Sequence, residues 1–567
     1  MRKYFPQQLF IVAIILLITS CGKKAPNEAK YIPKNVSMVV AINPKSLEEK
    51  LKTGNLTFDS ITNRILSNDK IFTEENKKKW EDFKNSGIDL ENNFYYFMTQ
   101  KGSLNADLRT TINIMAVMKD EAKFDKFIRE QKDINAADIE KSKDFSIVKT
   151  GKDVVMSWNK EVVILSITLE KASGTFDESG NYIEPDLSAI QSKLISEVKS
   201  YYSLKENESI ASVSYFKDMF KDKADGYMFS TTSGVSSLLS SSPFNIPKLQ
   251  ELVEGNYSTS TFNFENGKID VKSKSYLNPF LSSLVKKYGG KEVNKDFVEN
   301  FPSQNMNGAL LISFNPELLD ALLKELEIRG MVDGFLSKEG LTSADIFKVL
   351  KVEINFALSD FSLTTKEVPY NSSIDGTPST YSKTVPSYKL IFEAPVGDKA
   401  AFEKIMNKGV EMNLLTKTTT GYEGGEMINS TGMYFMADDK KIVLASDKEF
   451  YNTYLAKKTK SNISSDILKK FDDKTIAAYI DFNSIINGML PSIKDSTVLK
   501  GMNIVNGTFT NLVSTVEKFD GKSMNGKFEI NMKNTKQNSL VSFVNMLSDI
   551  FKVIKEDDKS RNEIIAN

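Results

Sequence analysis

The residues that could perform chemistry are few in this chain of 567 residues. It has no histidine and a single cysteine, Cys21. Nucleophilic systems that pair serine or cysteine with histidine are therefore excluded within the chain. Zinc, copper and haem sites built on histidine or cysteine are excluded for the same reason. An enzyme of this composition would need carboxylates, a Ser-Lys pair or a hard metal ion.

The sequence before Cys21 predicts a secretory signal. Arg2 and Lys3 form a charged start, residues 9–18 form an uninterrupted apolar run, and two small polar residues follow. This order is typical of a signal peptide. The apolar run has about ten residues, whereas a helix that spans a bilayer needs roughly 20. We therefore predict a cleaved signal peptide over residues 1–20.

Residues 18–21, Ile-Thr-Ser-Cys, resemble a bacterial lipobox. The resemblance implies that the Cys21 thiol receives diacylglycerol, that cleavage makes Cys21 the N-terminus, and that its amine is then acylated. Each buried methylene contributes about 0.8 kcal/mol, so two or three acyl chains anchor a protein where one is marginal. Residues 21–30 are then a polar tether, because they include a proline and lack apolar periodicity. The alternative is an ordinary signal peptide with an incidental cysteine.

Three further patterns could carry chemistry, and each has a plainer explanation. Oxygen-bearing side chains gather at residues 177–186, but their spacing is not that of an EF-hand, so we expect a solvated loop. Ser283 and Lys286 match a Ser-x-x-Lys pattern, but no Lys-Thr-Gly follows, and the stretch is typical of a packing helix. Trp158 could be a platform for a sugar, yet a strand-end aromatic usually packs in the core. We therefore predict no catalytic residue, no metal site and no cofactor.

Two short patterns are candidates for modification. Asp-Ser-Ile at residues 59–61 and Asp-Ser-Thr at residues 495–497 match an acceptor pattern of O-glycosylation in Bacteroidota. In a host of that kind, Ser60 and Ser496 are candidate acceptors. An ordinary helix-capping pair explains both patterns equally well, because aspartate and serine readily cap helices.

Composition limits the partners of the chain. Lysine plus arginine and aspartate plus glutamate both number 74, so no net charge draws the protein to nucleic acid. With 40% hydrophobic and 10% aromatic residues, the chain can bury substantial cores. We expect it to meet the membrane through the lipid on Cys21, and to meet an envelope protein or a glycan through its folded body.

The chain repeats its own order of motifs, which is a signature of internal duplication. The matching pairs are a strand, Asn-Pro and helix at residues 38–47 and 308–319, helices capped by Asp120 and Asp398, and Asn-Gly-Lys at residues 266–268 and 525–527. Asn-Gly predicts a hairpin turn in each copy. The alternative is a chance alignment of generic amphipathic patterns.

These patterns predict an α+β fold of two similar halves, residues 31–290 and 291–567. Each half has largely antiparallel sheets with helices packed on a face. The second half carries a polar insertion at residues 368–379. A loop of this length is either mobile or functional, and we expect it to be mobile.

Four stretches stand out together: the lipobox, Tyr-Ile-Pro at residues 31–33, Ser-Gly-Ile-Asp-Leu at residues 86–90, and the closing hairpin with residues 538–540. Together they resemble one family, the uncharacterised cell-envelope lipoproteins of Bacteroidota that carry a domain of unknown function. The resemblance implies a location and a class, but no activity. Lys23 and Lys24 stand where surface-exported lipoproteins of that phylum often carry acids. This departure favours an outer-membrane lipoprotein that faces the periplasm.

The sequence therefore predicts a non-catalytic lipoprotein that binds or scaffolds another envelope component. One alternative is an envelope hydrolase that uses carboxylates or a Ser-Lys pair. The other is a carrier of lipid or glycan, which would need an apolar or aromatic-lined cavity.

Overall fold

The structure is a computed structural model, and it describes residues 25–65, 74–103, 106–170, 175–176, 182–183, 187–232, 246, 248–351, 353–371 and 378–566. The predicted signal peptide and Cys21 lie outside these residues. The chain forms two compact units, which we describe separately. The first consists of Met1–Ser46, Lys78–Ser241 and Tyr257–Thr261, and the second of Leu47–Lys77, Ser242–Asn256 and Phe262–Asn567.

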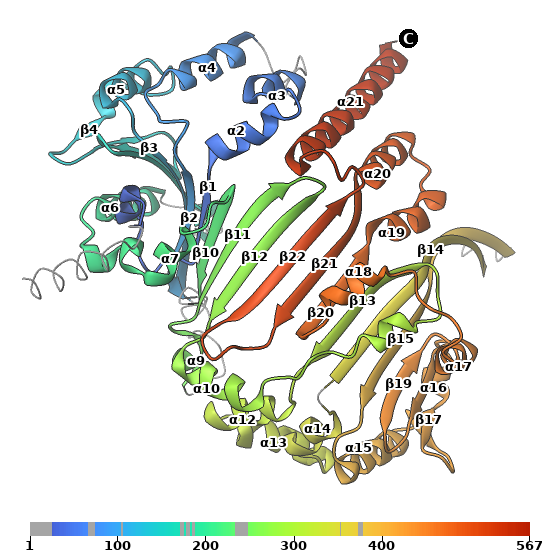
Figure 1. The fold of residues 1–567 in the computed structure, drawn as a ribbon. Coiled ribbons are helices and arrows are strands. Elements are labelled where there is room, and N and C mark those ends of the chain that lie inside the picture. The colour runs from blue at the N-terminus through green and yellow to red at the C-terminus, as the bar shows by residue number, and fades with distance from the viewer. Residues whose placement is uncertain are drawn as a thin grey trace, which may run out of the picture. The chain divides into compact units, whose positions relative to one another are not determined.

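The first unit is built on an antiparallel sheet (Figure 1). Its strands follow the order β10–β1–β2–β3–β7–β6–β5–β4, and every neighbouring pair is antiparallel. The strands are β1 (Met38–Ile42), β2 (Phe94–Ser103), β3 (Ala106–Val117), β4 (Glu140–Lys141), β5 (Ser146–Lys149), β6 (Val154–Trp158), β7 (Val162–Thr168) and β10 (Gly226–Thr231).

Helices cover both faces of this sheet. The main ones are α5 (Glu121–Arg129), α6 (Leu187–Tyr201) and α7 (Ser214–Met219). Ile164 on β7 packs in a core with α6 and α7, whereas its neighbour Val163 packs in a second core with α5. Successive strand residues point to opposite faces, so the two cores lie on opposite sides of the sheet. The sequence predicted helices on one face, and both are covered because β7 is apolar on both sides.

The second unit holds a longer antiparallel sheet. Its strand order is β12–β22–β21–β20–β13–β14–β15–β19–β18–β17–β16. The strands are β12 (Lys268–Tyr276), β13 (Met306–Ser313), β14 (Glu353–Asn371), β15 (Pro378–Pro395), β16 (Leu415–Lys417), β17 (Tyr422–Gly424), β18 (Tyr434–Ala437), β19 (Lys441–Ala445), β20 (Lys474–Asp481), β21 (Phe509–Glu517) and β22 (Met524–Met532). The predicted mixture of helices with largely antiparallel sheet is thus confirmed.

Three apolar clusters stabilise the second unit. Its helices include α2 (Pro44–Lys52), α3 (Phe58–Ile65), α10 (Pro279–Tyr288), α12 (Glu317–Glu325), α14 (Ser343–Val349), α15 (Lys399–Glu411), α17 (Lys448–Leu455), α18 (Ser465–Lys470), α19 (Phe482–Met489), α20 (Ser496–Thr508) and α21 (Ser539–Ala566). One cluster packs Val541 of α21 against Leu51 of α2 and against Leu56. Val541 lies so close to Gly54 that a Cβ at this position would be 2.4 Å from a Val541 methyl carbon. Only glycine therefore fits beside Val541.

One of the two predicted hairpin turns is wrong. Gly267 has a φ of 71° and joins β11 (Tyr257–Glu265) to β12, as its Asn-Gly pair predicted. The second Asn-Gly, at residues 525–526, lies inside β22 instead. Asp520 accepts hydrogen bonds from the N–H groups of Lys522 and Ser523, and Gly521 has a φ of 92°. The Asp-Gly pair at residues 520–521, five residues before the Asn-Gly, therefore forms the turn between β21 and β22.

The described residues of the polar insertion, 368–371 and 378–379, belong to a longer β-hairpin, and residues 372–377 lie outside the described part. Ten antiparallel pairs join residues 362–371 to residues 378–387, a segment that we call the arm. Its neighbour β13 pairs with β14 only over residues 353–359, and β19 pairs with β15 only over residues 391–395. The arm is therefore two strands wide among the described residues (Figure 1). Valine, threonine and tyrosine in both strands favour β-structure, so residues 368–371 and 378–379 are strand where the sequence predicted a mobile loop.

Aspartates open two helices as the sequence predicted. The Asp120 carboxylate accepts a hydrogen bond from the Lys123 N–H at the start of α5. The Asp398 carboxylate accepts one of 2.8 Å from the Ala401 N–H at the start of α15. Both charges also lie at the positive end of a helix dipole.

Replacement of Asp398 by alanine should lower stability by about 1 kcal/mol, because the helix loses its capping acceptor. Asp398→Asn keeps an acceptor and should recover most of that loss. Thermal unfolding of both variants, compared with the parent protein, measures the difference. Equal losses in the two variants would argue that the cap is not the cause.

Candidate functional site

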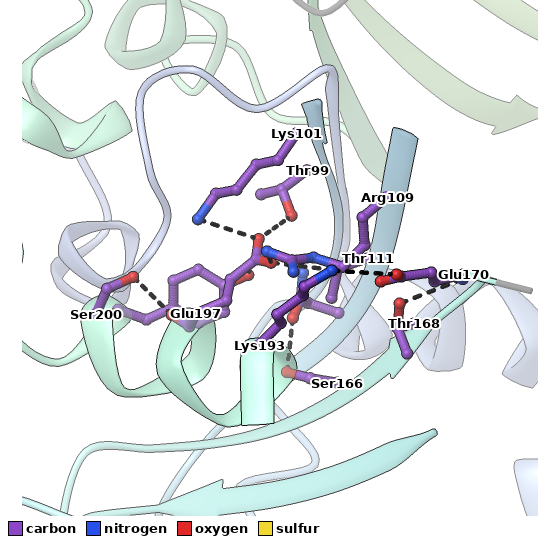
Figure 2. Close-up of polar contacts among 12 residues, drawn as sticks. Thr99, Lys101, Arg109, Thr111, Ser166, Thr168, Glu170, Lys193, Glu197 and Ser200 are labelled. Carbon is purple, nitrogen blue, oxygen red and sulfur yellow. Dashed lines mark hydrogen bonds and ion pairs between the residues drawn. The ribbon is translucent and has the colours of Figure 1, made fainter. Parts of the chain in front are cut away.

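A buried glutamate, Glu197, is the centre of a polar network beneath α6 (Figure 2). It is 3% exposed, and α6 places it against β2 and β3. Arg109 Nη2 lies 3.0 Å from Glu197 Oε2, and Lys101 Nζ lies 3.7 Å from Oε1. The carboxylate is thus an ion held by cations from two neighbouring strands.

Three hydroxyl groups complete the surroundings of the Glu197 carboxylate. Thr99 and Tyr201 donate to Oε1 over 2.6 and 3.2 Å, and Thr111 donates to Oε2 over 3.3 Å. Burial raises the pKa of Tyr201, and the charge of Glu197 raises it further, so the phenol stays protonated and keeps donating. A carboxylate with one guanidinium and three hydroxyl donors has its acceptor positions filled. The geometry therefore suits a structural ion better than a catalytic base.

Tyr201 also lines a hollow of ≈ 540 Å³, here called the tyrosine hollow. Phe145 and Tyr202 stack in its wall with ring centroids 4.5 Å apart, and Tyr31 tilts against Tyr202 at 5.5 Å. Charged side chains surround these rings, namely Lys30, Lys141, Lys143, Lys160, Glu121, Asp144 and Glu161. Aromatic faces among charged and polar groups suit a small polar ligand with one apolar side.

The second unit buries two carboxylates on neighbouring strands. Asp270 on β12 stands directly opposite Glu529 on β22, and the two residues are 1% and 3% exposed. Like charges opposite one another destabilise a sheet. Four lysines neutralise this pair, and we call the six residues the lysine clasp. The lysines are Lys268, Lys272, Lys470 and Lys527.

The clasp holds Glu529 more closely than Asp270. Lys470, Lys268 and Lys527 place their ammonium groups 2.5, 2.9 and 3.1 Å from the Glu529 carboxylate. The nearest lysine nitrogen to Asp270 is that of Lys527 at 3.5 Å. Burial raises the pKa of Glu529, but hydrogen bonds from the three lysines lower it more, to about 2. Glu529 is therefore charged at any physiological pH.

Ser283 offers no support for Ser-Lys chemistry. It lies on α10, is exposed, and its hydroxyl donates to the Phe280 carbonyl over 2.8 Å. It lines a hollow of ≈ 460 Å³, but Lys286 does not. Lys-Thr-Gly does occur upstream, at residues 52–54 and 149–151, and neither stretch lines this hollow.

The remaining candidate residues from the sequence are Cys21, the acidic stretch and Trp158. Cys21 lies outside the described residues, as does most of the acidic stretch at 177–186. Trp158 is 0% exposed and packs edge-on against Phe124, so the predicted core position is confirmed and a sugar cannot reach the ring. Among the described residues, no group of three or more acidic, histidine or cysteine side chains could hold a metal ion.

Both candidate glycosylation sites lie at helix starts. Ser60 stands in the first turn of α3, where its hydroxyl accepts from the Thr57 N–H over 2.8 Å. Ser496 is exposed and begins α20, after Asp495 has capped that helix. The capping explanation therefore holds for Asp495 and for Ser60 itself. Glycosylation of Ser60 and Ser496 stays a prediction.

Sequence reasoning missed Glu197, Asp270 and Glu529. Glu197 occupies an apolar face of α6 between Leu194 and Tyr201, and an acid at a core position was the signal available. The clasp acids each follow an Asn-Gly-Lys by two positions, at residues 266–270 and 525–529. This shared spacing could have identified the two acids as a matched pair.

The comparisons give a family and little else. A family model described as "Domain of unknown function (DUF4836)" matches residues 29–540. No curated protein matches the chain. Among solved structures, "Structure of crystal form I of TP0453" is 9% identical, with 48% of this chain and 88% of that chain covered and a TM-score of 0.22. "Structure of crystal form IV of TP0453" is 7% identical, with 46% and 85% covered and a TM-score of 0.23. Such low scores carry no argument about fold or function.

In the described part of the chain, every helix is too short or too polar to cross a membrane.

Replacement of Glu197 by leucine should destabilise the first unit by roughly 3–5 kcal/mol, because Arg109 would remain buried without its counter-ion. The double variant Arg109→Leu/Glu197→Leu should recover much of this loss, since no buried charge is then left unpaired and Lys101 is exposed. Urea unfolding of the parent, single and double variants measures both effects. A double variant as unstable as the single one would contradict a structural ion pair.

The lysine clasp should weaken in acid. The pKa of Glu529 falls from 4.5 to about 2 on folding, so its pairing stabilises the protein above pH 4.5. That stabilisation, about 3 kcal/mol, is lost as pH falls towards 2. Glu529→Gln should lower the melting temperature at neutral pH and show a smaller further drop in acid. Parallel melting curves of the two proteins over this range would disprove the assignment.

Proposed function

We propose that this chain, which belongs to the DUF4836 family of domains of unknown function, is a lipid-anchored, non-catalytic scaffold of the cell envelope. The lipobox-like residues 18–21 support an anchor through Cys21, and residues 21–30 then form the tether. The Lys23 and Lys24 pair favours the outer membrane, with the folded body in the periplasm.

The arm is the observation that carries the scaffold proposal. A two-stranded hairpin is marginally stable in water on its own, so an exposed one of ten residue pairs needs a reason to exist. Most of its described side chains are exposed on both faces. Such an element suits contact with another protein.

One face of the arm suits an acidic partner. Lys366 and Lys383 stand directly opposite each other, and both are exposed. Val368 and Tyr381 form a neighbouring pair two residues along, on the same face. Like charges opposite one another are unfavourable, so an acidic surface laid across this face would be stabilising. We therefore propose an envelope protein with an acidic patch as the partner.

The buried ions support a non-catalytic role. Glu197, Asp270 and Glu529 are all engaged by cations from adjacent strands or helices. Acids used as nucleophiles or proton carriers need access to substrate, and these three are at most 3% exposed. A lipid carrier gains no support either, since charged side chains line the tyrosine hollow and the hollow beside Ser283.

A glycan is the second candidate ligand, and the tyrosine hollow favours it. Sugars present apolar ring faces together with hydroxyl groups, which the Phe145 and Tyr202 stack and the surrounding charges match. Binding of soluble cell-wall fragments that is lost in Tyr202→Ala would support this role.

We further propose that the chain arose by internal duplication. The order β10–β1–β2–β3–β7–β6–β5–β4 of the first sheet has a counterpart in the order β20–β13–β14–β15–β19–β18–β17–β16 within the second. The capped helices α5 and α15 occupy the same place, each following the counterpart strands β3 and β15. Halves bounded at 290 and 291 fit this scheme.

The lysine clasp supports the duplication independently. It joins the two copies of Asn-Gly-Lys-x-acid, residues 266–270 and 525–529, on paired antiparallel strands. Lys268 reaches Glu529 and Lys527 reaches Asp270, so each copy neutralises the acid of the other. This reciprocal pattern is what two related segments make when they pair with each other.

Crosslinked co-purification from membranes tests the scaffold. The variant Lys366→Gln/Lys383→Gln should recover less of a reproducible partner than the parent, because its arm face has lost two charges. In the control, Thr365→Glu/Thr384→Glu, net charge changes by the same amount. Thr365 and Thr384 form the pair next to Lys366 and Lys383, so their side chains lie on the other face of the arm. The control should keep the partner.

Cys21→Ala should release the protein from membranes, whatever its partner. Recovery of the same partner with both arm variants would remove the arm from the proposal. Failure to recover any reproducible partner with the parent would contradict the scaffold itself.

A further inference from the structure

The lysine clasp borders a hollow of ≈ 510 Å³ within the second unit, here called the lysine hollow. Its floor is formed by residues of β12, β22 and β21, and its rim by the end of α18 and the start of β20. Six lysines line it, namely Lys272, Lys274, Lys469, Lys470, Lys474 and Lys527. Four elements thus direct ammonium groups to one place.

Most of the acidic side chains that line the lysine hollow are already paired with lysines. Glu529 is held in the clasp, and Glu517 is paired with Lys474 at 2.9 Å. Asp472 is paired with Lys295, which lies outside the lining. The fourth acid in the lining is Asp473. The carboxylates therefore do not cancel the positive charge that faces the hollow.

Three of the lysines have no hydrogen-bonded acceptor among the described residues. Lys272 lies 3.9 Å from Asp270, and Lys469 lies 4.0 Å from Asp466, both too long for a hydrogen bond. Lys274 has no ion pair within the part of the chain that the structure describes. Lys272 also stands directly opposite Lys527, an unfavourable pairing of like charges. An anion in the hollow would relieve this repulsion.

We propose that the lysine hollow binds a phosphate-bearing ligand. Lys272, Lys274 and Lys469 supply ammonium donors from two sides. Thr515 and Asn525 also line the floor, where the Asn525 amide already donates one hydrogen bond of 3.2 Å to Glu517. Charge-assisted hydrogen bonds to phosphate are short and strong, and several donors around a tetrahedral dianion add together. A soluble phosphate ester and a lipid headgroup offer the same group, so the chemistry of the site is the same for both. This inference does not depend on the scaffold or on the arm.

Calorimetric titration with inorganic phosphate and with pyrophosphate tests the soluble source. The full-length chain carrying Cys21→Ala serves as parent, so that no acyl chain confuses the result. The variant Lys272→Gln/Lys274→Gln/Lys469→Gln should bind phosphate and pyrophosphate with an affinity lower by roughly tenfold or more. It keeps Lys268, Lys470 and Lys527, the three lysines that contact Glu529, and of the clasp it loses only Lys272, whose nitrogen lies 3.9 Å from Asp270. Its melting temperature should therefore fall only a little below that of the parent.

The control Lys132→Gln/Lys152→Gln/Lys223→Gln removes three exposed lysines of the first unit and changes net charge equally. It should bind phosphate as the parent does. Sedimentation with phosphatidylcholine vesicles, with and without phosphatidic acid, tests the lipid source.

Retention on phosphatidic acid vesicles that the triple variant loses assigns the site to a headgroup, even where inorganic phosphate does not bind. Binding of inorganic phosphate or pyrophosphate that the triple variant loses assigns it to a soluble ligand. The proposal is overturned if none of the probes binds the parent, or if the control loses as much binding as the triple variant.

Discussion

The pairing of β12 with β22 depends on neutralising two carboxylates that the backbone places face to face. Asp270 and Glu529 would repel each other in a nearly dry environment, and the cost of such a pair is many times that of a surface repulsion. Four lysines remove the cost, and one of them, Lys470, comes from a helix and not from the sheet. The clasp also joins segments 261 residues apart in sequence, as in the bond from Lys268 to Glu529. A strand recruited from so far along the chain pays a loop-closure entropy that only strong contacts can offset.

Local signals were enough to predict many of the elements, but not the distant partners of the buried charges. Asp120, Asp398 and Gly267 act on their own neighbours within four residues, so their roles follow from the sequence. Glu197 is different, because its counter-ion Arg109 lies 88 residues away on another element. Nothing near either residue says that they will meet. The second Asn-Gly failed as a turn for a related reason, since a competing signal nearby took the reversal.

Under the duplication that we propose, the two sheets differ in the length of one strand pair. Strands β2 and β3 have 10 and 12 residues, whereas β14 and β15 have 19 and 18. The segments that pair with a third strand keep the common order of the sheet, and the extra length lies beyond them. Growth at the open end of a hairpin leaves the core contacts of Ala357 and Ile391 untouched. Under the duplication that we propose, the second copy gained a projecting element at little cost to its fold.

The prolines of the arm decide what kind of contact it can make. Pro369 lies in one strand and Pro386 in the other, and each lacks a backbone donor. Proline is tolerated in a sheet where its nitrogen faces solvent, so both outer edges of the arm are interrupted. Under the lipid anchor that we propose, copies of the chain are concentrated in the two dimensions of a membrane, where open strand edges would join into continuous sheets. Under that proposal, the arm can be displayed at high density without polymerising, and the proposed partner would contact its side-chain faces.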